Sequence, residues 1–65
     1  MAPESPDQIG SLIHALRTPL MIVEGFADAL VNRGEALSDA DRAEYLERIG
    51  DAAREMRELL DAVRR

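Results

Sequence analysis

The chain contains one histidine, which lies in the segment His14-Ala15-Leu16-Arg17-Thr18-Pro19-Leu20. An imidazole can act as a nucleophile or a general base, and it gains or loses a proton near neutral pH. The Thr18 hydroxyl follows four residues later, so on a helix it shares the face of the imidazole. The segment therefore offers a nucleophile with a polar group beside it.

The composition argues against several other kinds of site. The chain has no cysteine, which rules out disulfides and, with a single histidine, disfavours a structural zinc site. The formal net charge is −5, and every basic residue is an arginine. Such a chain is a poor match for the phosphates of nucleic acid or for an anionic membrane surface. We expect a protein partner, no nucleic acid, no direct membrane contact, and no cofactor or metal held by this chain.

The length and the apolar content indicate the fold class. Apolar residues make up 46% of the 65 residues and aromatic residues 3%, which favours an all-α fold. No apolar run approaches the roughly 18 residues of a membrane span, and the first residues lack the pattern of a signal peptide. Below about 70 residues a single core rarely suffices, so we expect association with another chain.

A first helix is predicted from about residue 7 to 33, after a flexible lead-in over residues 1–6 that contains two prolines. Ser5 and Asp7 are candidate caps of this helix. Apolar residues recur in steps of four and three, the period of a supercoiled helix. They are Ile9, Ile13, Leu16, Leu20, Val23, Ala27 and Leu30, with Leu12, Ile22 and Phe26 widening the stripe. A stripe this wide is typical of a helix in a bundle.

A loop over residues 34–38 and a second helix from about 39 to 65 follow. We expect Gly34 to end the first helix in a left-handed conformation and Ser38 to cap the second. The second apolar stripe has the same period, and it runs through Tyr45 or Leu46, Ile49, Ala52 or Ala53, Met56, Leu59 or Leu60, and Val63. So short a loop makes the helices antiparallel neighbours.

The antiparallel arrangement predicts which residues lie level with one another. Leu16 should lie level with Met56, Leu20 with Ala52, and Val23 with Ile49. His14 then lies level with Glu58. Because one hairpin leaves much of this wide stripe exposed, we expect two hairpins to form a homodimeric four-helix bundle.

Pro19 stands inside the first helical pattern. A proline there removes one backbone hydrogen bond and collides with the carbonyl of Ala15, at a cost of about 3 kcal/mol. We expect the helix to bend at this position, close to His14.

The seven residues from His14 to Leu20 resemble the H-box of the largest family of bacterial histidine kinases, in which His-Glu or His-Asp precedes Leu-Arg-Thr-Pro-Leu. Six of the seven positions agree. Residues 7–65 as a whole look like the dimerisation and phosphotransfer domain of a sensor kinase. The resemblance implies that His14 accepts a phosphoryl group and passes it to an aspartate of a response regulator receiver domain.

Further roles follow from the same resemblance. ATP and Mg²⁺ would bind a separate catalytic domain, so this chain alone is not a kinase. Thr18 matches a polar position that orients water when the regulator is dephosphorylated. Positions that choose the regulator fall on Met21, Gly25 and Phe26. The implied location of the domain is cytoplasmic, and whether a longer parent is anchored in a membrane is left open.

Ala15 departs from the family pattern. The family has an acid there, which hydrogen-bonds the imidazole and helps to remove its proton, and such groups typically supply about 10²- to 10⁴-fold in rate. No acid lies three or four residues from His14. Glu58, which is level with His14 on the second helix, is the candidate replacement.

The departure leaves several interpretations open. The domain could use another base, favour phosphatase or phosphotransfer work, or carry an introduced substitution at Ala15. It could also be a degenerate module that only dimerises. An unrelated helical adaptor would be indicated by a monomer or by a dimer that buries His14.

Overall fold

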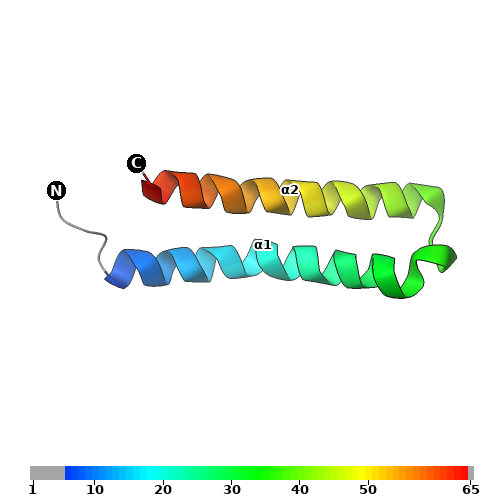
Figure 1. Ribbon diagram of the computed structural model, residues 1–65, viewed down its shortest axis with the longest axis horizontal. Coiled ribbons are helices and arrows are strands. Elements are labelled where there is room, and N and C mark those ends of the chain that lie inside the picture. Colours follow the sequence, from blue (N-terminus) through cyan, green and yellow to red (C-terminus); the bar gives the residue numbers. More distant parts are fainter. Residues whose placement is uncertain (1–5, 65) are drawn as a thin grey trace.

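The computed structural model describes residues 6–64 and shows a hairpin of two long helices (Figure 1). Helix α1 spans Pro6–Arg33, a short 3₁₀ helix η1 spans Gly34–Ala36, and helix α2 spans Asp39–Arg64. The described residues contain no strand, which confirms the predicted all-α hairpin. Most of the predicted lead-in, the candidate cap Ser5, and Arg65 lie outside the described residues.

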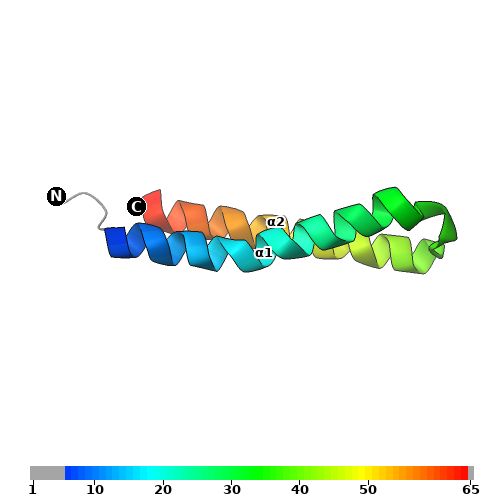
Figure 2. The same cartoon turned by 90° about the horizontal axis from the view of Figure 1, so that it is seen from below.

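Helix α1 begins one residue earlier than predicted and ends at Arg33 as predicted. Pro6 already belongs to the helix, since the first turn needs no backbone N–H donor and tolerates the fixed φ of proline. At the middle, Pro19 lies inside α1 and does not end it. Figure 2 shows the ribbon of α1 changing direction in its cyan part, around residue 20. A bend near Pro19 was expected from the hydrogen bond that proline removes.

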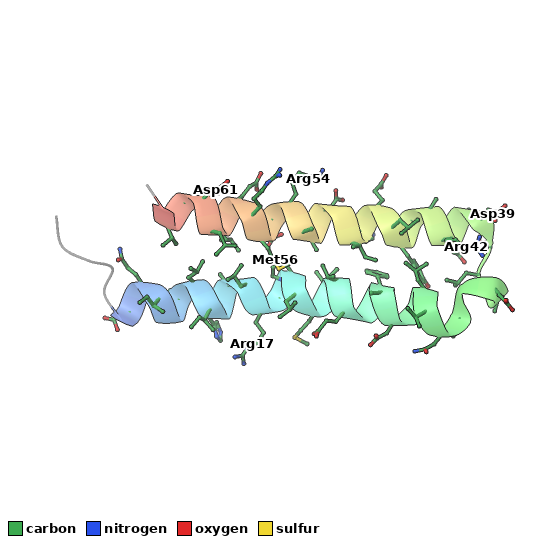
Figure 3. All side chains as sticks on the ribbon, viewed as in Figure 1. Arg17, Asp39, Arg42, Arg54, Met56 and Asp61 are labelled. Atoms are coloured by element: carbon green, nitrogen blue, oxygen red, sulfur yellow. The ribbon has the colours of Figure 1, made fainter. Side chains whose placement is uncertain are left out.

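The two helices face one another along a narrow apolar strip. On α1 the strip consists of Leu12, Leu16, Pro19, Val23, Phe26 and Leu30, and on α2 of Tyr45, Ile49, Ala52, Met56, Leu59 and Val63. Most of these side chains are half-buried. Only Ala52, at 5% exposure, and Pro19, below 2%, are fully buried among the described residues. Figure 3 shows the Met56 side chain directed from α2 toward α1.

One aromatic pair fixes the register between the helices. The rings of Phe26 and Tyr45 lie with their centroids 4.9 Å apart at an angle of 50°. Because the helices are antiparallel, each step forward along α1 corresponds to a step backward along α2. The residues that this register places side by side differ by one position from the pairs predicted from the sequence. The same register places Pro19 level with Ala52, so the two fully buried residues meet at the middle of the hairpin.

The apolar stripe predicted for α1 divides into two parts. Leu16, Val23 and Leu30 face α2, whereas Ile13 is 53% exposed and Leu20 is 46% exposed. The division arises because the stripe is wider than one neighbouring helix can cover. Pro19 takes the inward position beside Leu20.

The end of α1 corrects one expectation. Gly34 was predicted to be left-handed, but no described residue has a positive φ. Instead the chain tightens into η1, and the Leu37 N–H donates to the carbonyls of Arg33 at 3.2 Å and Gly34 at 3.4 Å. The Arg42 guanidinium also donates to the Gly34 carbonyl at 2.6 Å. Because these donors satisfy the last carbonyls, no left-handed residue is required.

The start of α2 follows the predicted cap. The Ser38 hydroxyl accepts a hydrogen bond from the Asp41 N–H at 3.0 Å, and the Ser38 carbonyl accepts the first helical bond from the Arg42 N–H at 2.9 Å. Farther along α2, Arg48 lies 4.0 Å from Glu44 in an exposed ion pair. Exposed pairs of this kind add little stability, so the cap is the main local determinant of where α2 begins.

Replacement of Ser38 by alanine should destabilise the hairpin by about 1 kcal/mol, because the Asp41 N–H loses its acceptor. Urea unfolding followed by circular dichroism, at one fixed chain concentration, measures the change. Ser38→Asp keeps a capping oxygen and serves as the matched control. If Ser38→Ala and Ser38→Asp lowered the free energy of unfolding equally, the capping oxygen would not be the source of the stability.

Candidate functional site

His14 lies on the outer face of α1. Leu12 and Leu16 on either side of it face α2, and successive residues of a helix are rotated by about 100°. His14 therefore points away from the second helix, and its side chain is exposed. It has no hydrogen bond or ion pair with any residue that the structure describes. The nucleophile expected from the sequence is thus open to an approaching partner domain.

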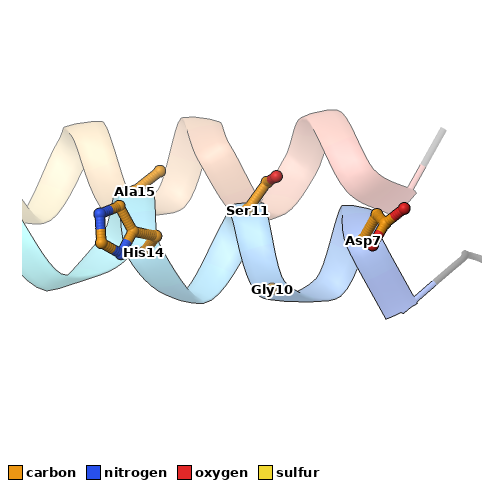
Figure 4. A pocket seen from close by; sticks show the side chains of 5 residues that line it. All are labelled: Asp7, Gly10, Ser11, His14 and Ala15. Carbon is orange, nitrogen blue, oxygen red and sulfur yellow. The ribbon is translucent and has the colours of Figure 1, made fainter.

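A shallow hollow lies beside His14 on α1 (Figure 4). It is lined by Asp7, Gly10, Ser11, His14 and Ala15. Asp7, Ser11 and His14 follow one another in steps of four and three, so they form a row along one face of the helix. Gly10 and Ala15 contribute almost no side chain, which keeps the hollow open next to the imidazole.

Thr18 extends the same row by one further turn. Its side chain is exposed, and its hydroxyl takes part in no hydrogen bond within the described part of the chain. The hydroxyl therefore does not bond back to the carbonyl of His14, a common arrangement for threonine in helices. It is available to a water molecule or to another protein at the His14 face.

The three residues proposed to choose a regulator do not share one environment. Met21 is 62% exposed, and a Cβ added at Gly25 would meet nothing within 4 Å. Their spacing from His14 places both on the outer side of α1. Phe26 instead packs against Tyr45 of α2 and is half-buried. It supports the surface from the inner side of the helix.

Glu58 lies level with His14 but on another face. Its neighbour Leu59 and the nearby Met56 are half-buried against α1, whereas Glu58 is exposed. The helical rotation between these residues turns Glu58 away from α1. No hydrogen bond or ion pair joins it to His14 among the described residues. Its proposed role as a base stays a prediction, and the isolated hairpin does not bring the two side chains together.

Two residues of the hollow were missed as site residues by the sequence reasoning. Asp7 was considered only as a helix cap, and Ser11 only as a residue that is not acidic. The signal was present in their spacing of seven and three residues from His14. That spacing gains meaning only once the outer face of α1 is known.

Other kinds of site find no support in the described residues. No group of three or more histidine, cysteine or acidic side chains is placed to hold a metal ion among them. Neither helix, within the described range, is both long and apolar enough to cross a bilayer. The outer face around His14 therefore remains the candidate site.

The first helix of this antiparallel hairpin carries an exposed histidine five residues before a buried proline. Comparison with protein families shows to which class of domain this arrangement belongs. The family model described as the His Kinase A (phospho-acceptor) domain matches residues 7–65. The chain belongs to this family. No curated protein and no solved structure matched the chain.

Membership of the family carries a general functional meaning. Domains of this family provide phosphoacceptor and dimerisation functions in histidine kinases of two-component signalling systems. Within the matched range, His14 is the single histidine of the chain.

Proposed function

We propose that this chain is a homodimeric phosphoacceptor domain that receives a phosphoryl group on His14 from a separate ATP-binding domain and relays it to an aspartate of a response regulator. The observation that supports this most directly is the exposed position of His14 on the outer face of α1, within the range matched by the family model. An acceptor must be reached by two partner domains in turn, and this face is open to both.

The reaction needs the nucleophile of His14 and a base, from this chain or its partner domain, that takes the proton of the other ring nitrogen once the ring is phosphorylated. The lone pair of one ring nitrogen of His14 attacks the γ-phosphorus of ATP, and a nitrogen–phosphorus bond forms. The bond from that phosphorus to the bridging oxygen breaks, and ADP leaves with the electron pair. The Mg²⁺ that accompanies ATP would neutralise charge on the phosphates in the separate domain. A carboxylate oxygen of the receiver domain then attacks the phosphorus, and the nitrogen–phosphorus bond breaks with its electron pair returning to the imidazole.

The outer surface of α1 beyond His14 is the proposed contact for the regulator. Met21 offers an exposed, flexible apolar side chain, which adapts readily to a partner. Gly25 has open space above its backbone and allows a partner to approach closely. Phe26 holds this part of α1 against α2 through Tyr45. Met21 and Gly25 lie on the same outer face of α1 as Thr18, and Phe26 supports this face from the inner side.

Dimerisation is supported by a second apolar face of the hairpin. Several exposed apolar residues come one position after a residue that faces the other helix. The pairs of inward and exposed residues are Leu12 and Ile13, Pro19 and Leu20, and Leu30 and Val31 on α1, and Tyr45 and Leu46, and Leu59 and Leu60 on α2. One residue forward rotates a side chain by about 100° around its helix. Because the helices are antiparallel, this rotation brings both sets to the same side of the hairpin.

The size of this apolar face calls for a partner. Leu46 is 56% exposed and Leu60 is 47% exposed, and burial of apolar area contributes roughly 25 cal/mol per Å². The interior of the hairpin, by contrast, fully buries two residues among those described. In a homodimer the apolar faces of two copies pack against each other, and together they form a core that one hairpin lacks.

Leu20→Glu should convert the dimer to monomers, raising the dissociation constant at least about a hundredfold because a charge would be buried at the interface. Sedimentation equilibrium measures the constant. Ala43→Glu places the same charge on an exposed position of α2, and it should leave the dimer intact. Two variants with equal dissociation constants would argue against this face as the dimer interface.

Phosphorylation tests the acceptor directly. The chain mixed with a matched ATP-binding domain should acquire an acid-labile label that is lost in His14→Ala, while ATP alone should leave it unmodified. Ala15→Glu restores an acid next to the imidazole and should increase the rate by roughly 10²- to 10⁴-fold.

The outcome shows whether His14 works as an acceptor without an acid at position 15 or is inactive because Ala15 replaces that acid. Labelling of the unmodified chain establishes a working acceptor with a base from elsewhere, and Glu58→Gln then tests that candidate. Labelling only in Ala15→Glu means an intact but inactive acceptor, which leaves dimerisation or phosphatase work as the role of the domain. Absence of label in both, with the partner domain active on a known substrate, contradicts the proposal.

A phosphatase-biased domain is the second candidate, and the combination of Ala15 with an exposed, unpaired Thr18 hydroxyl favours it. In that case the domain, with its ATP-binding partner, accelerates the hydrolysis of a phosphorylated receiver domain. Thr18→Ala should abolish the acceleration, because the hydroxyl that orients water is lost, while Thr18→Ser should retain it. Loss of phosphate from the receiver is followed by gel mobility. Equal hydrolysis with the alanine variant would rule out this role of Thr18.

A further inference from the structure

The hollow beside His14 contains groups that the proposed reaction has not yet used. Asp7 and Ser11 line it together with His14. No described residue forms a hydrogen bond or ion pair with either side chain. No neighbouring atom lies within 4 Å of the position that a Cβ of Gly10 would occupy. The space above the backbone of Gly10, between these side chains, is therefore open.

The spacing of the row determines which groups can meet. Residues three or four apart on a helix have Cβ atoms about 5–6 Å from each other, within reach of a hydrogen bond between their side chains. Asp7 and Ser11 are four apart, and Ser11 and His14 are three apart. Asp7 and His14 are separated by about 10 Å along the axis. The carboxylate therefore reaches the imidazole only through Ser11.

Charge on this part of α1 comes from few residues. Between Pro6 and Val23 the only acid is Asp7, and the only fixed positive charge is that of Arg17. A serine hydroxyl both accepts and donates a hydrogen bond. Ser11 can thus accept the N–H of one ring nitrogen of His14 and donate its own proton to the carboxylate of Asp7.

We propose that Ser11 and Asp7 are positioning residues for His14 and take over the orienting role of the acid that Ala15 does not provide. This inference rests on the proposed phosphoacceptor function. The hydrogen bond from one ring nitrogen to Ser11 fixes the tautomer of the neutral imidazole. The lone pair of the other nitrogen is then held outward, toward an approaching phosphoryl group.

The arrangement forms by rotation of exposed side chains. Figure 4 shows Asp7, Ser11 and His14 on successive turns of α1, with the imidazole ring not in contact with the Ser11 hydroxyl. Exposed rotamers interchange on the picosecond to nanosecond scale. The common χ1 values of helical residues direct side chains back over the preceding turn. For His14 the preceding turn carries Ser11.

The ratio of the two neutral tautomers of His14 tests the proposal without any phosphorylation. Because His14 is the only histidine, its ring nitrogens are observed directly by ¹⁵N NMR of the labelled full chain at mildly alkaline pH. Ser11→Ala should change the tautomer ratio roughly two- to tenfold, the effect of one hydrogen bond. Asp7→Asn should shift it in the same direction, and Ser11→Thr, which keeps the hydroxyl, should restore the original ratio.

Asp28→Asn is the matched control, since it removes one acid from an exposed position of α1 far from the hollow, and it should leave the ratio unchanged. Circular dichroism verifies that each variant keeps its helices. An unchanged ratio in Ser11→Ala overturns the proposal, and an unchanged ratio in Asp7→Asn overturns the part assigned to the carboxylate. If instead the ratio responds as expected but His14 is never labelled, the phosphoacceptor function fails and the positioning row stands.

Discussion

The inner surface shared by two helices is the constraint on which the rest of this molecule depends. A hairpin has no third layer, so each helix can bury only the strip that faces its neighbour. At the middle of the strip Pro19 and Ala52 are the two residues that become fully buried. On either side of them the helices meet through half-buried leucine, isoleucine, methionine and aromatic side chains. All other surfaces of the helices remain free for contacts with other chains.

The free surfaces divide the work of the domain between different faces. Exposed apolar side chains, such as Leu20 and Leu46, come one position after residues of the inner strip and form one face. On the outer face of α1 lie His14, Thr18 and the open surface around Gly25. The two faces point in different directions, so a contact made at the first face would leave the second accessible. The same geometry explains why His14 is exposed although Leu12 and Leu16 on either side of it face α2.

Much of the fold follows from periodicity. The steps of three and four predict two helices, and the cap at Ser38 is present as expected. Periodicity alone does not say which half of a wide apolar stripe meets the neighbouring helix, because both halves are equally apolar. Leu16 faces α2 whereas Ile13 does not. Nor does it show that the Arg42 side chain satisfies the Gly34 carbonyl, which makes a left-handed glycine unnecessary.

The positions of the candidate site residues can be predicted from the sequence only in part, for a similar reason. The outward direction of His14 follows from its place between inward-facing residues. The residues around it are harder to predict, because a position level with His14, such as Glu58, need not share its face. The height of a residue along the hairpin depends on the register between the helices, whereas the direction of its side chain depends on the rotation within its own helix. Asp7 and Ser11 lie on the same face of α1 as His14. Glu58 lies at the height of His14 but points in another direction.

The two ends of the hairpin are mechanically unequal. At one end the chain turns through η1, where the Arg42 guanidinium holds the Gly34 carbonyl and the Phe26 ring lies on that of Tyr45. At the other end, which carries His14, α1 begins and α2 finishes side by side (Figure 1). The described contacts of the Arg42 and Phe26 side chains thus hold the helices together at the connected end of the hairpin. His14 lies nearer, along α1, to the start of this helix than to the connection with α2.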